Sequence, residues 1–130
     1  MAYSVDWYIH NRILNVRFID YIDDNDMAGV NAEVIDHLDG LQNKAHLVVD
    51  LRGLKKYPTN VRHIKDFTEY LRHPNMGFVI ALGIDNPLMR FFATVIPQVV
   101  GIDFRSAKEM DEALAILRRV DTTLTEVAGD

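Results

Sequence analysis

HLVVDL at residues 46–51 and GFVIAL at residues 77–82 are two strand-like stretches of this 130-residue chain. Both are rich in β-branched and aliphatic residues, and neither alternates regularly between polar and apolar positions. This pattern is typical of strands that are covered on both faces, as in the centre of a parallel sheet. We therefore predict two neighbouring parallel strands with helices packed against them.

The N-terminal segment predicts a β-hairpin. Residues 4–9 and 13–20 alternate between apolar and polar side chains, with Val5, Trp7 and Ile9 on one face of the first strand. Only residues 10–12 separate the two strands. Because a parallel return needs a crossover of about a dozen residues or more, we expect antiparallel pairing.

Two amphipathic helices are predicted before the second buried strand. The first covers residues 24–39, with Asp23 or Asp24 as its N-cap and Gly40 as the left-handed residue at its end. The second covers residues 61–71 and must end by His73, because the following proline disfavours helical geometry in its predecessor.

Two further helices and a short strand are predicted after the second buried strand. Asn86-Pro87 begins a third helix, which ends or kinks at Pro97. Residues 102–105 form a short strand. The segment from Ser106 to Glu109 has the pattern of a capping box, which predicts that a fourth helix begins there and continues to about Val120.

The resulting order is β-β-α-β-α-β-α-β-α, an α/β fold with a mostly parallel sheet flanked by helices. The length suits one domain, residues 1–130. We expect its core to cover residues 3–120 and its polar tail, residues 121–130, to fray.

Composition argues against several classes of function. The net charge of -5 argues against nucleic-acid binding, which needs a clustered excess of Lys and Arg. The chain has no cysteine, so thiolate chemistry is excluded and a reducing compartment, the cytoplasm, is the expected location. No signal-peptide pattern opens the chain, and the apolar stretch at residues 88–100 is too short to span a bilayer.

Three stretches resemble the SpoIIAA-like, or STAS-like, domains of anti-anti-sigma factors, within about residues 7–117. Val48–Leu54 resembles the motif that ends a strand in this family, which reads apolar, apolar, Asp, Leu, any residue, Gly and apolar. Asn86–Phe92 is similar to the helix start after the fourth strand, and the third stretch runs from Val100 to Leu117. The resemblance implies the SpoIIAA-like fold and a regulatory role that depends on a protein partner.

The resemblance also draws attention to the loop before the second helix. Phosphorylatable members carry Asp-Ser-Ser/Thr-Gly there, and a kinase partner modifies the first serine. Pro58-Thr59-Asn60-Val61 takes this place, so the hydroxyl is kept while the flanking Asp and Gly are lost. Thr59 is a candidate phosphoacceptor or a helix cap, and we favour the cap.

Basic side chains gather in the same region, between residues 52 and 65, with no acid among them. Cations close to a helix start can bind an anionic group or an acidic partner. Lysines in loops commonly contribute only solubility, and we favour that simpler interpretation. The candidate partner- or anion-binding residues are Arg52, Lys55, Lys56, Asn60 and Arg62.

No pattern predicts catalysis, a cofactor or a metal. The five histidines lack paired ligand spacing, and the two serines lack a nucleophile motif. We therefore predict a non-enzymatic interaction module with an unidentified protein partner. The alternative is a domain that binds a small apolar or anionic ligand, such as a lipid or a nucleotide, because aromatic side chains are available to line a pocket.

The third predicted helix has apolar residues on more than one side. Such a helix must be deeply buried or covered by another subunit. We predict a homodimer contact at Met89, Phe92 and Ile96.

Overall fold

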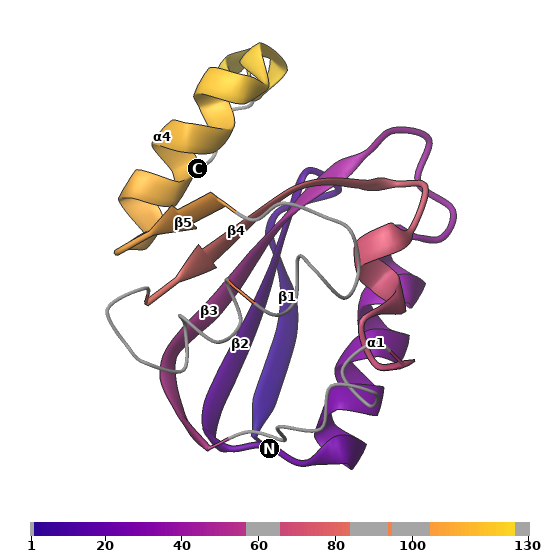
Figure 1. Ribbon diagram of the computed structural model, residues 1–130. Helices are drawn as coiled ribbons and strands as arrows, with labels where there is room; N and C mark the ends of the chain where they lie inside the picture. The colour runs from indigo at the N-terminus through magenta and orange to yellow at the C-terminus, as the bar shows by residue number, and fades with distance from the viewer. Residues whose placement is uncertain (1, 57–65, 84–93, 95–104, 127–130) are drawn as a thin grey trace.

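A computed structural model describes residues 2–56, 66–83, 94 and 105–126 (Figure 1). Five strands in this part of the chain form one sheet in the order β1-β2-β3-β4-β5. The elements are β1 (Tyr3–Ile9), β2 (Ile13–Tyr21), α1 (Asp24–Leu38), β3 (Ala45–Lys56), the 3₁₀ helix η1 (Glu69–Arg72), β4 (Met76–Leu82), β5 (Arg105–Ala107), α4 (Met110–Val120) and the 3₁₀ helix η2 (Thr122–Glu126).

The two stretches predicted as central strands lie side by side. β3 pairs with β4 in parallel, with Leu47 opposite Val79 and Asp50 opposite Leu82. β2 and β5 flank this pair, also in parallel, and β1 pairs antiparallel with β2. The predicted fold class, an α/β fold with a mostly parallel sheet, is confirmed.

Two hydrophobic cores lie on opposite faces of the sheet. Because side chains alternate between the faces of a strand, Leu47 and Val49 of β3 pack on the side of α1, while Val48 packs on the side of α4. Figure 1 shows α1 on one side of the sheet and α4 on the other. A register shift between Trp7 and Ile9 turns Ile9 into the second core, so the prediction that Ile9 shares a face with Trp7 was wrong.

The boundaries of α1 follow the predicted capping pattern. Asp23 is the N-cap, and its carboxylate accepts a hydrogen bond from the Asp26 N–H, while the Asp26 carboxylate accepts one from the Asp23 N–H. Gly40 has a φ angle of 83°, the left-handed geometry expected just beyond a helix end.

The capping box predicted at Ser106 is wrong. Ser106 lies in β5, where it pairs with Ala81 of β4, so its backbone belongs to the sheet. The N-cap of α4 is Glu109, and the helix starts at Met110. The strand predicted at residues 102–105 instead reaches Ala107 in the described part of the chain.

The second helix was predicted to continue to Leu71, but the chain has left α-helical geometry before that residue. Thr68 has φ -124° and ψ 27°, and η1 follows it. The Tyr70 N–H donates to the side-chain oxygen of Asn31 on α1, at 3.1 Å. A tertiary hydrogen bond therefore replaces a helical one, and η1 ends before His73 as predicted.

Packing continues beyond residue 120, where we expected the core to end. Leu124 of η2 is only 1% exposed and belongs to the core under α4. The segment directly after α4 is therefore held against the sheet. Among the described residues, no helix has the length and apolar character needed to cross a membrane.

Candidate functional site

The predicted basic residues that the structure describes lie at the carboxyl end of β3. Arg52, Lys55 and Lys56 are exposed there, and Arg17 of β2 adds a fourth cation beside them. We call these four residues the basic edge. Six predicted site residues lie outside the described part of the chain: Thr59, Asn60, Arg62, Met89, Phe92 and Ile96.

Asp50 anchors the basic edge to the sheet. Its side chain is buried, with the residue 3% exposed, and both carboxylate oxygens accept hydrogen bonds from the Arg52 guanidinium, at 3.0 and 2.9 Å. The Arg17 guanidinium lies 3.4 Å from the same carboxylate. Burial acts to raise the pKa of Asp50, but the hydrogen bonds from Arg52 and the charge of Arg17 outweigh it and lower the pKa. Two arginines thus share one buried carboxylate.

The two lysines differ in their surroundings. The Lys55 ammonium lies 3.6 Å from the Asp20 carboxylate, and both side chains are well exposed, so this pair is weak. Lys56 is exposed and forms no ion pair with another described residue.

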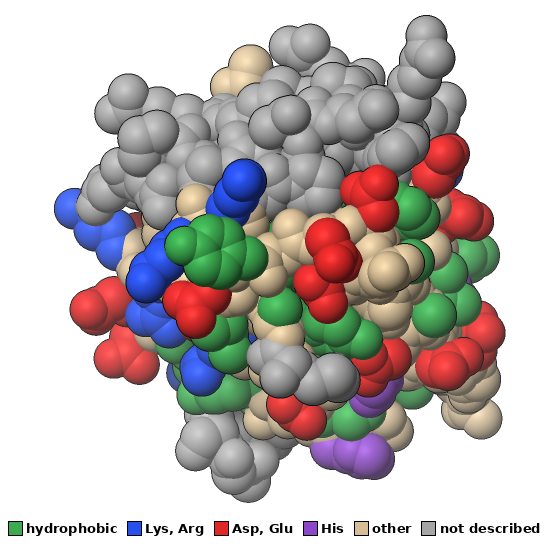
Figure 2. All heavy atoms as spheres, turned by 90° about the horizontal axis from the view of Figure 1, so that it is seen from below, with side chains coloured by type: hydrophobic (Ala, Val, Ile, Leu, Met, Phe, Trp, Pro, Cys, Tyr) green, Lys and Arg blue, Asp and Glu red, His purple; other side chains and the backbone are tan. Residues whose placement is uncertain are grey.

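Two large apolar side chains are exposed next to these cations. Ile19 is 39% exposed and pairs with Gly53, and Tyr21 is 63% exposed and pairs with Lys56. Figure 2 looks onto the lower end of the molecule as Figure 1 draws it and shows Lys and Arg side chains gathered on one side, with acidic side chains both beside them and over the rest of this face. This end of the sheet thus combines accessible cations with accessible apolar area.

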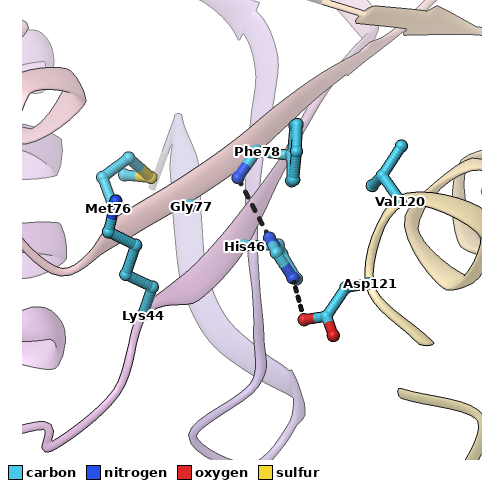
Figure 3. A pocket seen from close by; sticks show the side chains of 7 residues that line it. All are labelled: Lys44, His46, Met76, Gly77, Phe78, Val120 and Asp121. Atoms are coloured by element: carbon cyan, nitrogen blue, oxygen red, sulfur yellow. Dashed lines mark hydrogen bonds and ion pairs between the residues drawn. The ribbon is translucent and has the colours of Figure 1, made fainter. Parts of the chain in front are cut away.

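A second group of polar side chains lies at the opposite end of β3. His46 is 5% exposed, and its Nδ1 accepts a hydrogen bond from the Phe78 N–H, at 3.0 Å. Because Nδ1 is an acceptor, the ring proton is on Nε2, which donates to the Asp121 carboxylate at 2.7 Å (Figure 3). The ring is therefore held as a single tautomer between β4 and the end of α4.

Asp121 is fully engaged by its neighbours. One carboxylate oxygen accepts from His46 and from the Arg12 guanidinium, the latter at 3.1 Å. The other oxygen accepts from the Thr123 N–H and the Thr123 hydroxyl. Burial acts to raise the pKa of Asp121, but the hydrogen bonds from Thr123 and His46 prevail and lower it to about 2.

This arrangement argues against a catalytic role for His46. A general base or a metal ligand needs a free ring nitrogen, and both nitrogens of His46 are already bound. The described residues contain no group of three or more His, Cys, Asp or Glu side chains that could hold a metal. The contacts instead join five segments of the chain: the β1–β2 turn, β3, β4, the end of α4 and η2.

A hollow of about 370 Å³ opens beside His46. Gly77 lies in its wall, where a Cβ atom would stand 2.5 Å from His46 Nδ1, so only glycine leaves room for the ring. The residues that line the hollow are Lys44, His46, Met76, Gly77, Phe78, Val120 and Asp121 (Figure 3).

The sequence analysis missed this site. The sequence near the site holds one signal, which is a histidine in a strand that is otherwise almost wholly apolar. A buried polar group needs a hydrogen-bonding partner, so this histidine indicates that a partner lies close to it in the fold. Asp121 was assigned to the fraying tail instead. Nothing near either residue in the sequence links it to the other.

No family model and no curated protein matches the sequence. The structure of the anti-sigma factor antagonist SpoIIAA in its unphosphorylated form is 14% identical, with a TM-score of 0.61, over 91% of this chain and 98% of that one. SpoIIAA in its phosphorylated form, described as a Bacillus cell fate determinant, is 16% identical with a TM-score of 0.60, over 90% and 100%. The chain has the SpoIIAA-like fold.

A third structure agrees with this assignment. It is an uncharacterised protein of the DUF3478 family from Shewanella loihica PV-4 with a SpoIIAA-like fold, 15% identical, with a TM-score of 0.63, over 89% of this chain and 92% of that one. The fold implied by the sequence resemblance is thus confirmed. Identities this low show a shared fold, and function must be argued from the residues of the site.

Proposed function

We propose that this SpoIIAA-like domain is a non-enzymatic interaction module that binds an acidic surface of a protein partner through its basic edge. The observation that carries the proposal is the exposure of Lys56, Ile19 and Tyr21 side by side at the carboxyl ends of β2 and β3. Loops and strand ends at this edge of a parallel sheet commonly bind ligands and partners in α/β folds.

The charges favour an acidic partner. Within the described part of the chain, four cations of the basic edge stand against three nearby acids, Asp20, Asp50 and Glu109, although the whole chain carries a net charge of -5. Complementary charge mainly increases the rate of association and selects the partner. The free energy of binding would come chiefly from burying Tyr21 and Ile19, since aromatic side chains dominate most interfaces.

Two further observations support a role without turnover. The buried His46–Asp121 pair has no free ring nitrogen for proton transfer. One of the similar structures is described as an anti-sigma factor antagonist, which is a regulatory protein by its description.

The test is affinity capture from the native lysate with three tagged proteins. They are the wild type, a variant with Lys55→Glu and Lys56→Glu, and a control with Lys108→Glu and Arg119→Glu. The control changes the charge equally at exposed positions on and next to α4. We expect the wild type and the control to capture the same partner in equal amounts. The basic-edge variant should capture at least about tenfold less of it.

A Tyr21→Ala variant tests the apolar part of the proposal without changing the charge. We expect it to weaken capture and to leave the salt dependence of binding unchanged. The proposal is wrong if all of these proteins capture the same partners equally, or if none captures a reproducible partner.

A further inference from the structure

The hollow beside His46 is a second candidate binding site, at the opposite end of β3 from the basic edge. We propose that it binds a small monocarboxylate with an apolar body. This inference does not depend on the proposed function of the basic edge, because the two places share no residue.

Apolar side chains supply most of the wall. Met76 and Phe78 come from β4, and Val120 comes from the last turn of α4 (Figure 3). Phe78 is 40% exposed, since the described residues of β5 pair with Ile80–Leu82 of β4 and do not reach it. Its ring lies 5.6 Å from the ring of His46, and the Arg105 guanidinium lies 5.4 Å from its centroid. A ligand with an apolar body would cover this exposed aromatic surface.

Of the polar side chains that line the hollow, Lys44 is the one that the described residues leave available to bind a ligand. His46 uses both ring nitrogens, and the carboxylate of Asp121 accepts four hydrogen bonds. Lys44 is exposed at the edge of the hollow, and within the described part of the chain no carboxylate lies close enough to form an ion pair with it. Among these described lining side chains, the free donor is therefore the Lys44 ammonium group, which selects an anion.

The number of donors and the volume narrow the ligand class. Among the side chains that line the hollow, one lysine offers a compact single charge, and the Arg105 guanidinium outside the lining is placed over the Phe78 ring. Phosphate groups are usually bound by several donors at once. A volume of about 370 Å³ is near the lower limit for small-molecule sites, which typically measure about 300–1,000 Å³. A short aryl or alkyl acid fits both constraints, with its carboxylate at Lys44 and its body against Phe78, Met76 and Val120.

The test is a titration of the ¹⁵N-labelled full chain with benzoate and hexanoate, followed by amide chemical shifts. Benzamide is the neutral control ligand. We expect both acids to shift the amide signals of Gly77, Phe78 and Val120, and benzamide to bind about fivefold more weakly, which is about 1 kcal/mol.

Two variants and one control test the named residues. Lys44→Gln should weaken benzoate about fivefold and leave benzamide unchanged, while Lys108→Gln should change neither. Val120→Trp should fill the hollow and abolish binding, and its amide spectrum also shows whether it folds. The proposal is overturned if the acids shift no signals around the hollow up to about 10 mM, where even a weak site would respond. It is equally overturned if Lys44→Gln binds benzoate as the wild type does.

Discussion

The Nε2 atom of His46 and the carboxylate of Asp121 lie 2.7 Å apart, although 75 positions separate the two residues in the sequence. His46 stands near the start of β3, and Asp121 is the C-cap of α4. The Arg12 guanidinium, from the β1–β2 turn, reaches the same carboxylate. This hydrogen-bonded group therefore holds the end of α4 against the sheet and orders the segment that follows.

Replacing Asp121 should destabilise the fold strongly. Asp121→Ala leaves the buried His46 Nε2–H without its acceptor and removes the ion pair of the Arg12 guanidinium, which keeps only the Thr123 hydroxyl, so we expect a loss of about 2–3 kcal/mol in the free energy of unfolding. Urea denaturation followed by circular dichroism measures it. Asp36→Ala, at an exposed position of α1, is the matched control and should change the free energy by less than about 0.5 kcal/mol. Equal effects of the two substitutions would contradict this account.

The same carboxylate should make stability depend on pH in the acid range. Its pKa is about 2 in the folded protein, below the ordinary value of 3.8. A group with a lowered folded pKa contributes stability above its unfolded pKa, and this contribution disappears as the pH falls from about 3.8 towards 2. The difference corresponds to about 2 kcal/mol.

The measurement compares the free energy of unfolding of the wild type and of Asp121→Asn between about pH 6 and pH 2.5. Asp50 also has a lowered pKa, so both proteins lose stability in acid. The wild type should lose about 2 kcal/mol more than the variant. Parallel pH profiles would show that Asp121 does not titrate as described.

Gly77→Ala should displace the His46 ring. The added Cβ would stand 2.5 Å from Nδ1, which is a steric clash. The ring must therefore move, and the hydrogen bond from the Phe78 N–H would be lost. We expect a loss of about 1–3 kcal/mol and a shifted ¹⁵N signal of Nδ1. Gly53→Ala is the control in β3, since its Cβ would meet only Phe18 O, at 3.5 Å. That variant should be as stable as the wild type within about 0.5 kcal/mol.

The parts of the fold that local residues encode were predictable. Two apolar runs specified the central strands, and an aspartate cap at position 23 or 24 specified the start of α1, because these signals act over a few neighbouring residues. Ser106 shows the limit of such signals. It has a capping-box pattern, but pairing with Ala81 in the sheet competes for its backbone, and that competition depends on tertiary structure.

The site at His46 was not predictable for the same reason. Five histidines and nineteen acidic residues allow many pairs, and only the packing of α4 on the sheet brings His46 and Asp121 together. The basic edge was partly predictable, since Arg52, Lys55 and Lys56 are close in sequence. Its fourth member, Arg17, and the exposed apolar neighbours Ile19 and Tyr21 were not predicted, because the pairing of β2 with β3 brings them there.

Asp50→Asn should separate stability from partner binding. The substitution removes the charge that Arg52 and Arg17 share, so we expect a loss of about 1–3 kcal/mol in the free energy of unfolding at neutral pH. Because the pKa of Asp50 is lowered in the folded state, this difference from the wild type should shrink as the pH falls below about 3.8. The control is Asp20→Asn, since its exposed pair with Lys55 contributes less than about 0.5 kcal/mol and asparagine tolerates its φ angle of 54°.

The same variant makes the basic edge more positive by one charge. If the edge binds an acidic partner, Asp50→Asn should capture it at least as well as the wild type under conditions where both are folded, although the variant is less stable. The measurement is a salt titration of capture, in which the variant should show an equal or steeper dependence on ionic strength. Weaker capture by the folded variant would mean that the partner recognises the Asp50–Arg52 pair itself, and not the positive charge of the edge.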